Sequence, residues 1–120
     1  MKRRNPFMRM SLSAQVLSLT IALTAPSAHA DAGTYLINVT VRPGYNFNGA
    51  ADALAYGQGI CDKTAAGRPY ENLMTDIKTD FNTSDEYQAS YLIVQAVNEL
   101  CPALIWQLRN SAAHYRPTQP

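Results

Sequence analysis

The 120-residue sequence lacks most of the features that are typical of a catalytic, metal-binding or nucleic-acid-binding protein. It contains no Cys-x-x-Cys pair, no glycine-rich phosphate loop and no nucleophile elbow. Its histidines are limited to His29 and His114, and two cysteines add too few ligands for a zinc site. No cofactor is therefore expected. Outside the first residues, Lys and Arg do not cluster, which argues against nucleic acid as a partner.

The sequence also lacks an apolar run of the ~20 residues that a membrane span requires. Residues 1–30 instead combine a basic head, a shorter apolar stretch from Leu12 to Leu23 and the ending Ala28-His29-Ala30. This order predicts a secretory signal peptide cleaved before Asp31, with an uncleaved membrane anchor as the alternative. We therefore expect the mature protein to be secreted or held in the cell envelope, without a stable membrane span.

Cleavage would leave about 90 residues, enough for one compact domain. We predict a single helical domain over residues 31–116, followed by a flexible tail at 117–120. The mature part carries six basic and nine acidic residues, a net charge of −3 against +1 for the whole chain. The basic character of the precursor therefore belongs to the signal peptide.

The spacing of apolar residues predicts an all-α fold, a small bundle of about four to five helices. The predicted helices cover residues 48–66 with Asn48 as N-cap, 69–81, 83–101 and 104–112. Gly67 is expected to end the first of them, and Thr83 to Glu86 fits a capping box at the start of the third. The third helix is the most apolar, so it is expected to be central and most buried.

Two segments are less regular. Residues 34–41 are rich in β-branched residues, which favours a strand, but no partner strand is apparent in the chain. We favour a short helix there. Residues 42–49 contain Pro43, Gly44 and Gly49 and are predicted to form a loop. Within the first long helix, Gly57 and Gly59 each cost roughly 1 kcal/mol of helix propensity, and close packing of a neighbouring helix would explain them.

Cys61 and Cys101 are expected to form a disulfide, because two cysteines in a short exported chain normally pair. Closing a loop of this length contributes roughly 4 kcal/mol in the chain-entropy description. A redox or nucleophilic cysteine is the alternative.

Two stretches of sequence resemble a known family. They are Gly57-Gln58-Gly59-Ile60-Cys61 and the segment from Ala89 to Cys101-Pro102. Together with Gly67 and Pro69 they resemble the small exported family called domain of unknown function 732, which is typical of mycobacteria and their actinobacterial relatives. The resemblance implies an all-helical exported domain with Cys61 joined to Cys101 and no established activity or catalytic residues. Leu100 and Thr64 depart from the family pattern, which has an aromatic and an apolar residue at these positions.

Two pairs of residues could support chemistry. Ser111 and His114 are spaced to share a helix face, and Asp76 and Asp80 could bind calcium or act as an acid/base pair. We interpret the first pair as surface neighbours near the C-terminus and the second as part of a solvated helix face.

The seven tyrosines all lie in the mature part. Tyr70, Tyr87 and Tyr91 have the spacing of helix core residues. Four other aromatic residues are candidates for an interface with a partner, because Tyr and Trp combine apolar area with a polar group: Tyr35, Tyr45, Phe47 and Trp106.

These observations favour a non-enzymatic binding module whose partner is an unknown protein or cell-envelope component. A small enzyme or enzyme inhibitor that uses surface carboxylates, and a purely structural envelope component, are the alternatives.

Overall fold

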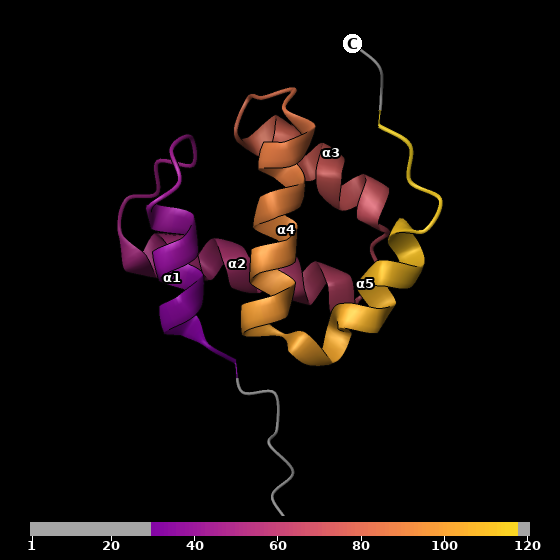
Figure 1. Ribbon diagram of the computed structural model, residues 1–120, viewed down its shortest axis with the longest axis horizontal. Coiled ribbons are helices and arrows are strands. Elements are labelled where there is room, and N and C mark those ends of the chain that lie inside the picture. Colours follow the sequence, from indigo (N-terminus) through magenta and orange to yellow (C-terminus); the bar gives the residue numbers. More distant parts are fainter. Residues whose placement is uncertain (1–29, 118–120) are drawn as a thin grey trace, which may run out of the picture.

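The computed structural model describes residues 30–117, and within this range the chain is helical and contains no strand. The elements are α1 (Ala32–Thr40), α2 (Ala50–Ala65), α3 (Tyr70–Asp80), α4 (Glu86–Leu100), the 3-10 helix η1 (Pro102–Leu104) and α5 (Ile105–Ala112), shown in Figure 1. The all-α prediction is confirmed, and the strand alternative for residues 34–41 is wrong because they lie in α1 and its C-cap. The predicted signal peptide, apart from Ala30, lies outside the described residues, as do residues 118–120 of the predicted tail.

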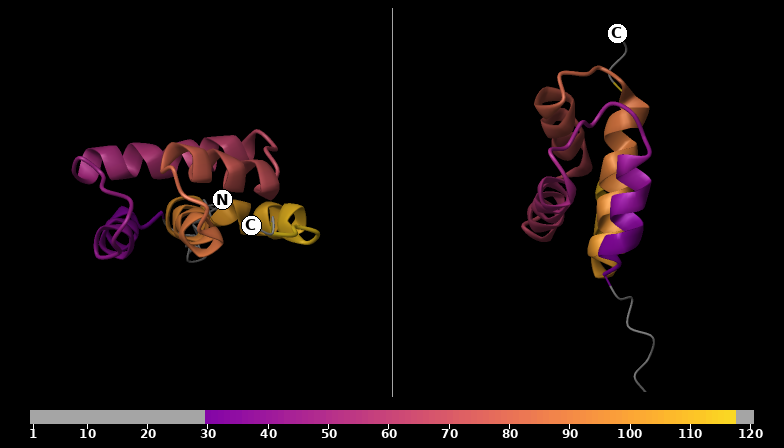
Figure 2. Two further views of the ribbon diagram at one scale, coloured as in Figure 1. Left: turned by 90° about the horizontal axis from the view of Figure 1, so that it is seen from above. Right: turned by 90° about the vertical axis from the view of Figure 1, so that its left-hand side faces the viewer.

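The helices form two layers (Figure 2). Helices α2 and α3 make one layer, and α1, α4 and α5 make the other. Within the second layer α1 and α4 run side by side in opposite directions, and α2 crosses behind both of them (Figure 1). Helix α4 contacts α1, α2, α3 and α5, as expected for the central helix.

The core is built around α4. The inner face of this helix contributes residues that are at most 6% exposed: Ala89, Leu92, Ile93, Ala96, Val97 and Leu100. The prediction that Tyr87 is a core residue is wrong, because its side chain is 61% exposed. Periodicity placed Tyr87 at the edge of the apolar face, where its ring contacts the Arg42 guanidinium and the Tyr91 ring.

Side chains from α1 and α4 pack against Gly57 of α2, which explains this glycine. A Cβ atom at position 57 would lie 2.6 Å from Leu100 Cδ1 and 2.6 Å from Tyr35 Cζ. The Tyr35 hydroxyl donates a hydrogen bond to the carbonyl of Ala53, with an O–O distance of 2.8 Å. Gly59 has no atom within 4 Å of its Cβ position, so the packing explanation is confirmed for Gly57 and wrong for Gly59.

The start of α4 differs from the predicted capping box. Its N-cap is Asp85, whose carboxylate accepts hydrogen bonds from the backbone N–H groups of Tyr87 and Gln88. The Thr83 hydroxyl accepts a hydrogen bond from the Asp85 N–H, and the Glu86 carboxylate binds Lys78 Nζ and the Tyr115 hydroxyl. Thr83 and Asp85 are both residue types that cap helices well. The Glu86 carboxylate binds Lys78 and Tyr115 instead of reaching back to the Thr83 N–H, as a capping box would require.

The start of α2 also differs from the sequence prediction, whereas its end agrees with it. Gly49, at φ +122°, occupies the N-cap position that was predicted for Asn48. The backbone N–H of Asn48 instead donates to the Asp52 carboxylate at 3.0 Å. Gly67 follows the helix at φ +86°, as predicted for a residue that ends a helix in the left-handed region.

The predicted disulfide is present and joins α2 to the residue that follows α4. Cys61 and Cys101 are bonded, with a Cα–Cα distance of 6.0 Å, within the usual range. Nearby, Thr64 is 2% exposed, and its hydroxyl donates to the carbonyl of Ile60 within the same helix. The buried Thr64 hydroxyl therefore has a hydrogen-bond partner within its own helix.

No single helix among residues 30–117 is both long and apolar enough to span a membrane. Only α4 taken together with the segment Pro102–Ala112 reaches that length and composition, and the two parts are bent by 117°.

Candidate binding groove

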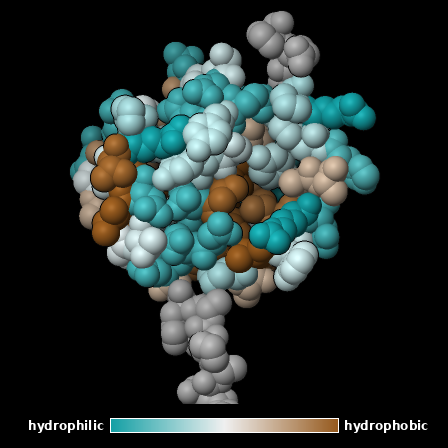
Figure 3. All heavy atoms as spheres, in the orientation of Figure 1, coloured by the Kyte–Doolittle hydropathy of each residue, from teal (hydrophilic) through white to brown (hydrophobic). Residues whose placement is uncertain are grey.

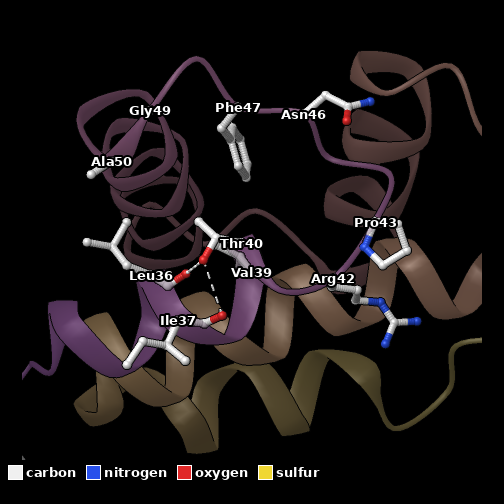
Figure 4. Close-up of a pocket in the computed structure, with 10 residues that line it drawn as sticks. All are labelled: Leu36, Ile37, Val39, Thr40, Arg42, Pro43, Asn46, Phe47, Gly49 and Ala50. Atoms are coloured by element: carbon white, nitrogen blue, oxygen red, sulfur yellow. Dashed lines mark hydrogen bonds between the residues drawn. The ribbon is translucent and has the colours of Figure 1, made fainter.

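A hollow on the described surface lies between α1, the loop 41–49 and the first turn of α2. Its volume is about 470 Å³, within the range of small-molecule sites. Most of its lining is apolar: Leu36, Ile37, Val39, Pro43, Phe47 and Ala50. Figure 4 shows Phe47 pointing from the loop toward α1, with Leu36 and Ile37 at one end and Arg42 at the other.

The loop is held over this groove by special backbone conformations and one buried side chain. Gly44, Asn46 and Gly49 all have positive φ angles, which turn the loop back toward α2. Between them, Tyr45 is only 4% exposed, and its hydroxyl donates to the carbonyl of Gln88 in α4 at 2.6 Å. Tyr45 therefore fixes the loop to the core, and Phe47, two residues later, forms one wall of the groove.

Phe47 is also part of an aromatic cluster that connects the groove to the interior of the domain. The cluster consists of Tyr45, Phe47, Tyr56 and Phe81, with ring centroids 5.1 to 5.9 Å apart. The Tyr56 hydroxyl donates to Asp80 Oδ2 at 2.7 Å. Burial, with the hydrogen bond to Asp80 adding to it, raises the pKa of Tyr56 above its ordinary value. Phe47 of the groove wall is thus packed against the rings of Tyr45, Tyr56 and Phe81.

Two of the four aromatic interface candidates are not at the surface. Tyr35 is 0% exposed and Tyr45 is 4% exposed, so the prediction that they line a surface patch is wrong. Burial raises the pKa of both hydroxyls to about 12, and both donate to backbone carbonyls. Phe47 does line the groove. Trp106 is 71% exposed, but it belongs to α5, at the opposite side of the molecule from α1 (Figure 1).

The sequence reading missed Ile37 and Arg42 as groove residues. Ile37 is 63% exposed although it is strongly apolar. A signal was present, because Ile37 is an apolar residue on the side of α1 opposite to Tyr35 and Val39, the two buried residues of this helix. An apolar residue on the side of a short helix that does not face the core is left exposed, as Ile37 is.

Among the described residues, Arg42 is the only charged one that lines the groove. Its guanidinium carbon lies 4.5 Å from the ring centroid of Tyr87 and 4.3 Å from that of Tyr91. Such cation–π contacts orient the side chain on the surface of α4. The Tyr91 hydroxyl in turn donates to the carbonyl of Asn38 in α1, so α1, the loop and α4 are connected at this end.

The carboxylates suggested as an acid/base pair have separate structural partners. Asp76 binds Arg68 Nε at 2.6 Å and Lys63 Nζ at 3.1 Å, and Asp80 accepts from Tyr56. The hydrogen bond from Arg68 is the main cause of the lowered pKa of Asp76. Both carboxylates therefore belong to contacts between α2, its C-terminal turn and α3.

Ser111 and His114 are likewise not brought together as a catalytic pair. Ser111 Oγ accepts a hydrogen bond from the Tyr70 N–H and donates to the carbonyl of Leu108. Its hydroxyl is thus occupied in joining α5 to the start of α3. Within residues 30–117 no group of three or more His, Cys, Asp or Glu side chains is placed to hold a metal ion.

The ion pairs of Asp76 lead to a prediction about acid stability. The pKa of Asp76 is lowered from 3.8 in the folded protein. The ionised carboxylate therefore contributes fully to the free energy of unfolding at pH values above 3.8, and this contribution is lost as the pH falls through the lowered pKa. We expect Asp76→Asn to lower the free energy of unfolding by about 0.5–1 kcal/mol at neutral pH, since the partners are partly exposed. Urea denaturation over a pH series measures this difference, which should disappear in acid.

Asp62→Asn is the matched control, since Asp62 is an exposed residue of α2 that forms no ion pair among the described residues. Equal effects of the two substitutions at neutral pH would contradict a specific role for Asp76.

Comparison with known proteins gives a family but no functional assignment. No curated protein and no solved structure matches the chain. Residues 30–103 match the family described as "Protein of unknown function (DUF732)". The matched region contains both cysteines, the whole groove and the central helix α4. The match covers more than half of the chain, and the protein therefore belongs to the DUF732 family of proteins of unknown function.

Proposed function

We propose that this protein is exported, loses its signal peptide before Asp31, and acts outside the cytoplasm as a non-enzymatic binding module. Its site is the groove between α1, the loop 41–49 and α2, and its ligand is an extended apolar chain with an acidic end. The Cys61–Cys101 disulfide supports the location, because such bonds persist in oxidising compartments. The basic and apolar order of residues 1–30 supports the export step.

The apolar lining of the groove is the observation that carries the binding proposal. Ile37 is 63% exposed at the groove, and neighbouring Val41 is 75% exposed. Hydrophobic spheres gather over α1 at the left edge of the molecule in Figure 3. An apolar surface next to a hollow of this size is typical of a site that is covered by a ligand.

The charge distribution supports an acidic end on that ligand and argues against catalysis. Arg42, the one charged residue in the described part of the chain that lines the groove, lies at the end opposite Leu36 and Ile37 (Figure 4). No Asp, Glu, His, Cys or Ser of the described residues lines the groove. The hydroxyl of the lining residue Thr40 donates to the carbonyl of Leu36, and no described lining residue is placed to act as its general base. The net charge of −3 in the mature part disfavours nucleic acid as a partner.

A titration with dodecanoate, below the concentration at which it forms micelles, tests the proposal. We expect saturable binding with amide chemical-shift changes confined to α1, the loop 41–49 and the first turn of α2. Ile37→Asp should weaken binding roughly tenfold or more, because it replaces the exposed apolar wall with a like charge.

Val94→Asp is the matched control, since Val94 is an exposed apolar residue of α4 that does not line the groove. Both positions are exposed, so thermal unfolding of both variants should remain close to that of the wild type. Absence of saturable binding, shifts spread over the whole domain, or equal weakening by both substitutions would contradict the groove as the site.

A further inference from the structure

The beginning of α1 contacts the end of α4 through the backbone. The N–H of Asp31 donates a hydrogen bond to the carbonyl of Glu99, with an N–O distance of 2.5 Å. Glu99 lies in the last turn of α4, where carbonyl groups have no partner within the helix. Figure 1 shows the first residues of α1 next to the lower end of α4. The contact therefore satisfies a helix-end carbonyl and joins two antiparallel helices.

Asp31 is also the N-cap of α1. Its carboxylate accepts hydrogen bonds from the Thr34 N–H at 2.9 Å and from the Thr34 hydroxyl at 2.7 Å. The backbone hydrogen bond from Thr34 is the main cause that lowers the pKa of this carboxyl, so it is ionised at neutral pH. The residue before it, Ala30, is exposed and lies outside any helix. The Ala30–Asp31 peptide bond thus directly precedes the nitrogen that contacts Glu99.

We propose that cleavage of this bond creates a charged contact that the precursor does not have. Hydrolysis consumes one water: Ala30 keeps the new carboxylate, and the Asp31 nitrogen takes up a proton to become an ammonium group. That ammonium then donates to the carbonyl of Glu99 in place of the neutral amide N–H. The inference rests on the proposed export and cleavage, and it adds that cleavage itself stabilises the contact between α1 and α4.

Two effects favour the charged form of the contact. A hydrogen bond from an ionised donor is roughly twice as strong as a neutral one. The C-terminal end of α4 also carries partial negative charge, which favours a cation there. The same ammonium lies near the N-terminus of α1, where a cation is unfavourable, but the ionised carboxylate of Asp31 occupies that position and offsets the repulsion.

Three versions of the mature domain test the inference. One begins with a free amine at Asp31, the second is acetylated at that amine, and the third keeps Ala30 as its first residue. The acetylated chain retains an N–H donor without the charge, and the third chain moves the charge one residue away. Urea denaturation near pH 6, about two units below the ordinary α-amino pKa, gives the equilibrium constant for unfolding of each.

The free-amine chain should have an unfolding constant roughly two- to fivefold smaller than the acetylated chain. The chain that keeps Ala30 should resemble the acetylated one, and it serves as the comparison if acetylation prevents folding. Equal stability of all three chains, or lower stability of the free-amine chain, would overturn the inference. Neither result bears on export, which is measured separately by the N-terminus of the exported protein.

Discussion

Replacing Cys61 and Cys101 together with alanine is expected to lower the free energy of unfolding by about 2–5 kcal/mol. The bridge closes a loop with a sequence separation of 40, and losing it gives the unfolded chain much more freedom. It also joins α2 to the residue after the central helix, so its loss loosens the contact between the two layers. In a domain of about 90 residues, this is a large share of the total stability. Urea denaturation of the mature domain measures the change.

The reduced wild type is the matched control, because it has the same side chains without the bond. Dithiothreitol should bring the wild type close to the double variant and leave the double variant unchanged. A wild type whose stability does not change on complete reduction would contradict the predicted contribution of the disulfide.

Alanine at Gly57 and alanine at Gly59 are expected to change stability in opposite directions, although the two positions lie on the same helix. At Gly57 the added Cβ would be 2.6 Å from atoms of Leu100 and Tyr35, and Tyr35 is fully buried. Overpacking of this kind costs about 1–3 kcal/mol. At Gly59 the Cβ has no neighbour within 4 Å, so the better helix propensity of alanine should stabilise the domain by up to about 1 kcal/mol.

Thermal and urea unfolding of the two single variants measure the difference, with circular dichroism to establish that both remain helical. Each variant acts as the control for the other, since the chemical change is the same. Stabilisation by Gly57→Ala equal to that of Gly59→Ala would mean that α1 and α4 do not approach α2 as closely as the structure shows.

The helices were predictable because each has its own local signal. Apolar spacing indicated α2, α3, α4 and α5, and Gly67 indicated the end of α2. The caps were less predictable, since Thr83 and Asp85 both suit the start of a helix and only the folded structure selects Asp85. Local sequence therefore predicts where a helix lies better than which residue caps it.

The candidate site was less predictable because it depends on contacts between distant segments. The tyrosine hydroxyls at positions 35 and 45 bond to carbonyls 18 and 43 residues away, which no local pattern indicates. Tyr45 and Phe47 of the loop 41–49 were therefore interpreted as surface residues. In the structure Tyr45 is buried, and of the two only Phe47 lines the groove. The groove itself combines α1, a loop and the start of α2, so its existence follows from the packing of three segments.

The central claim is that the functional species is an exported domain that begins at Asp31 and is closed by a disulfide. Intact-mass measurement of the protein recovered from the medium and envelope of a bacterial host producing the full precursor tests it most directly. We predict the mass of residues 31–120, lighter by two hydrogens than the same chain after reduction. A membrane-embedded species that retains Met1, or an exported chain with two free thiols, would contradict the claim.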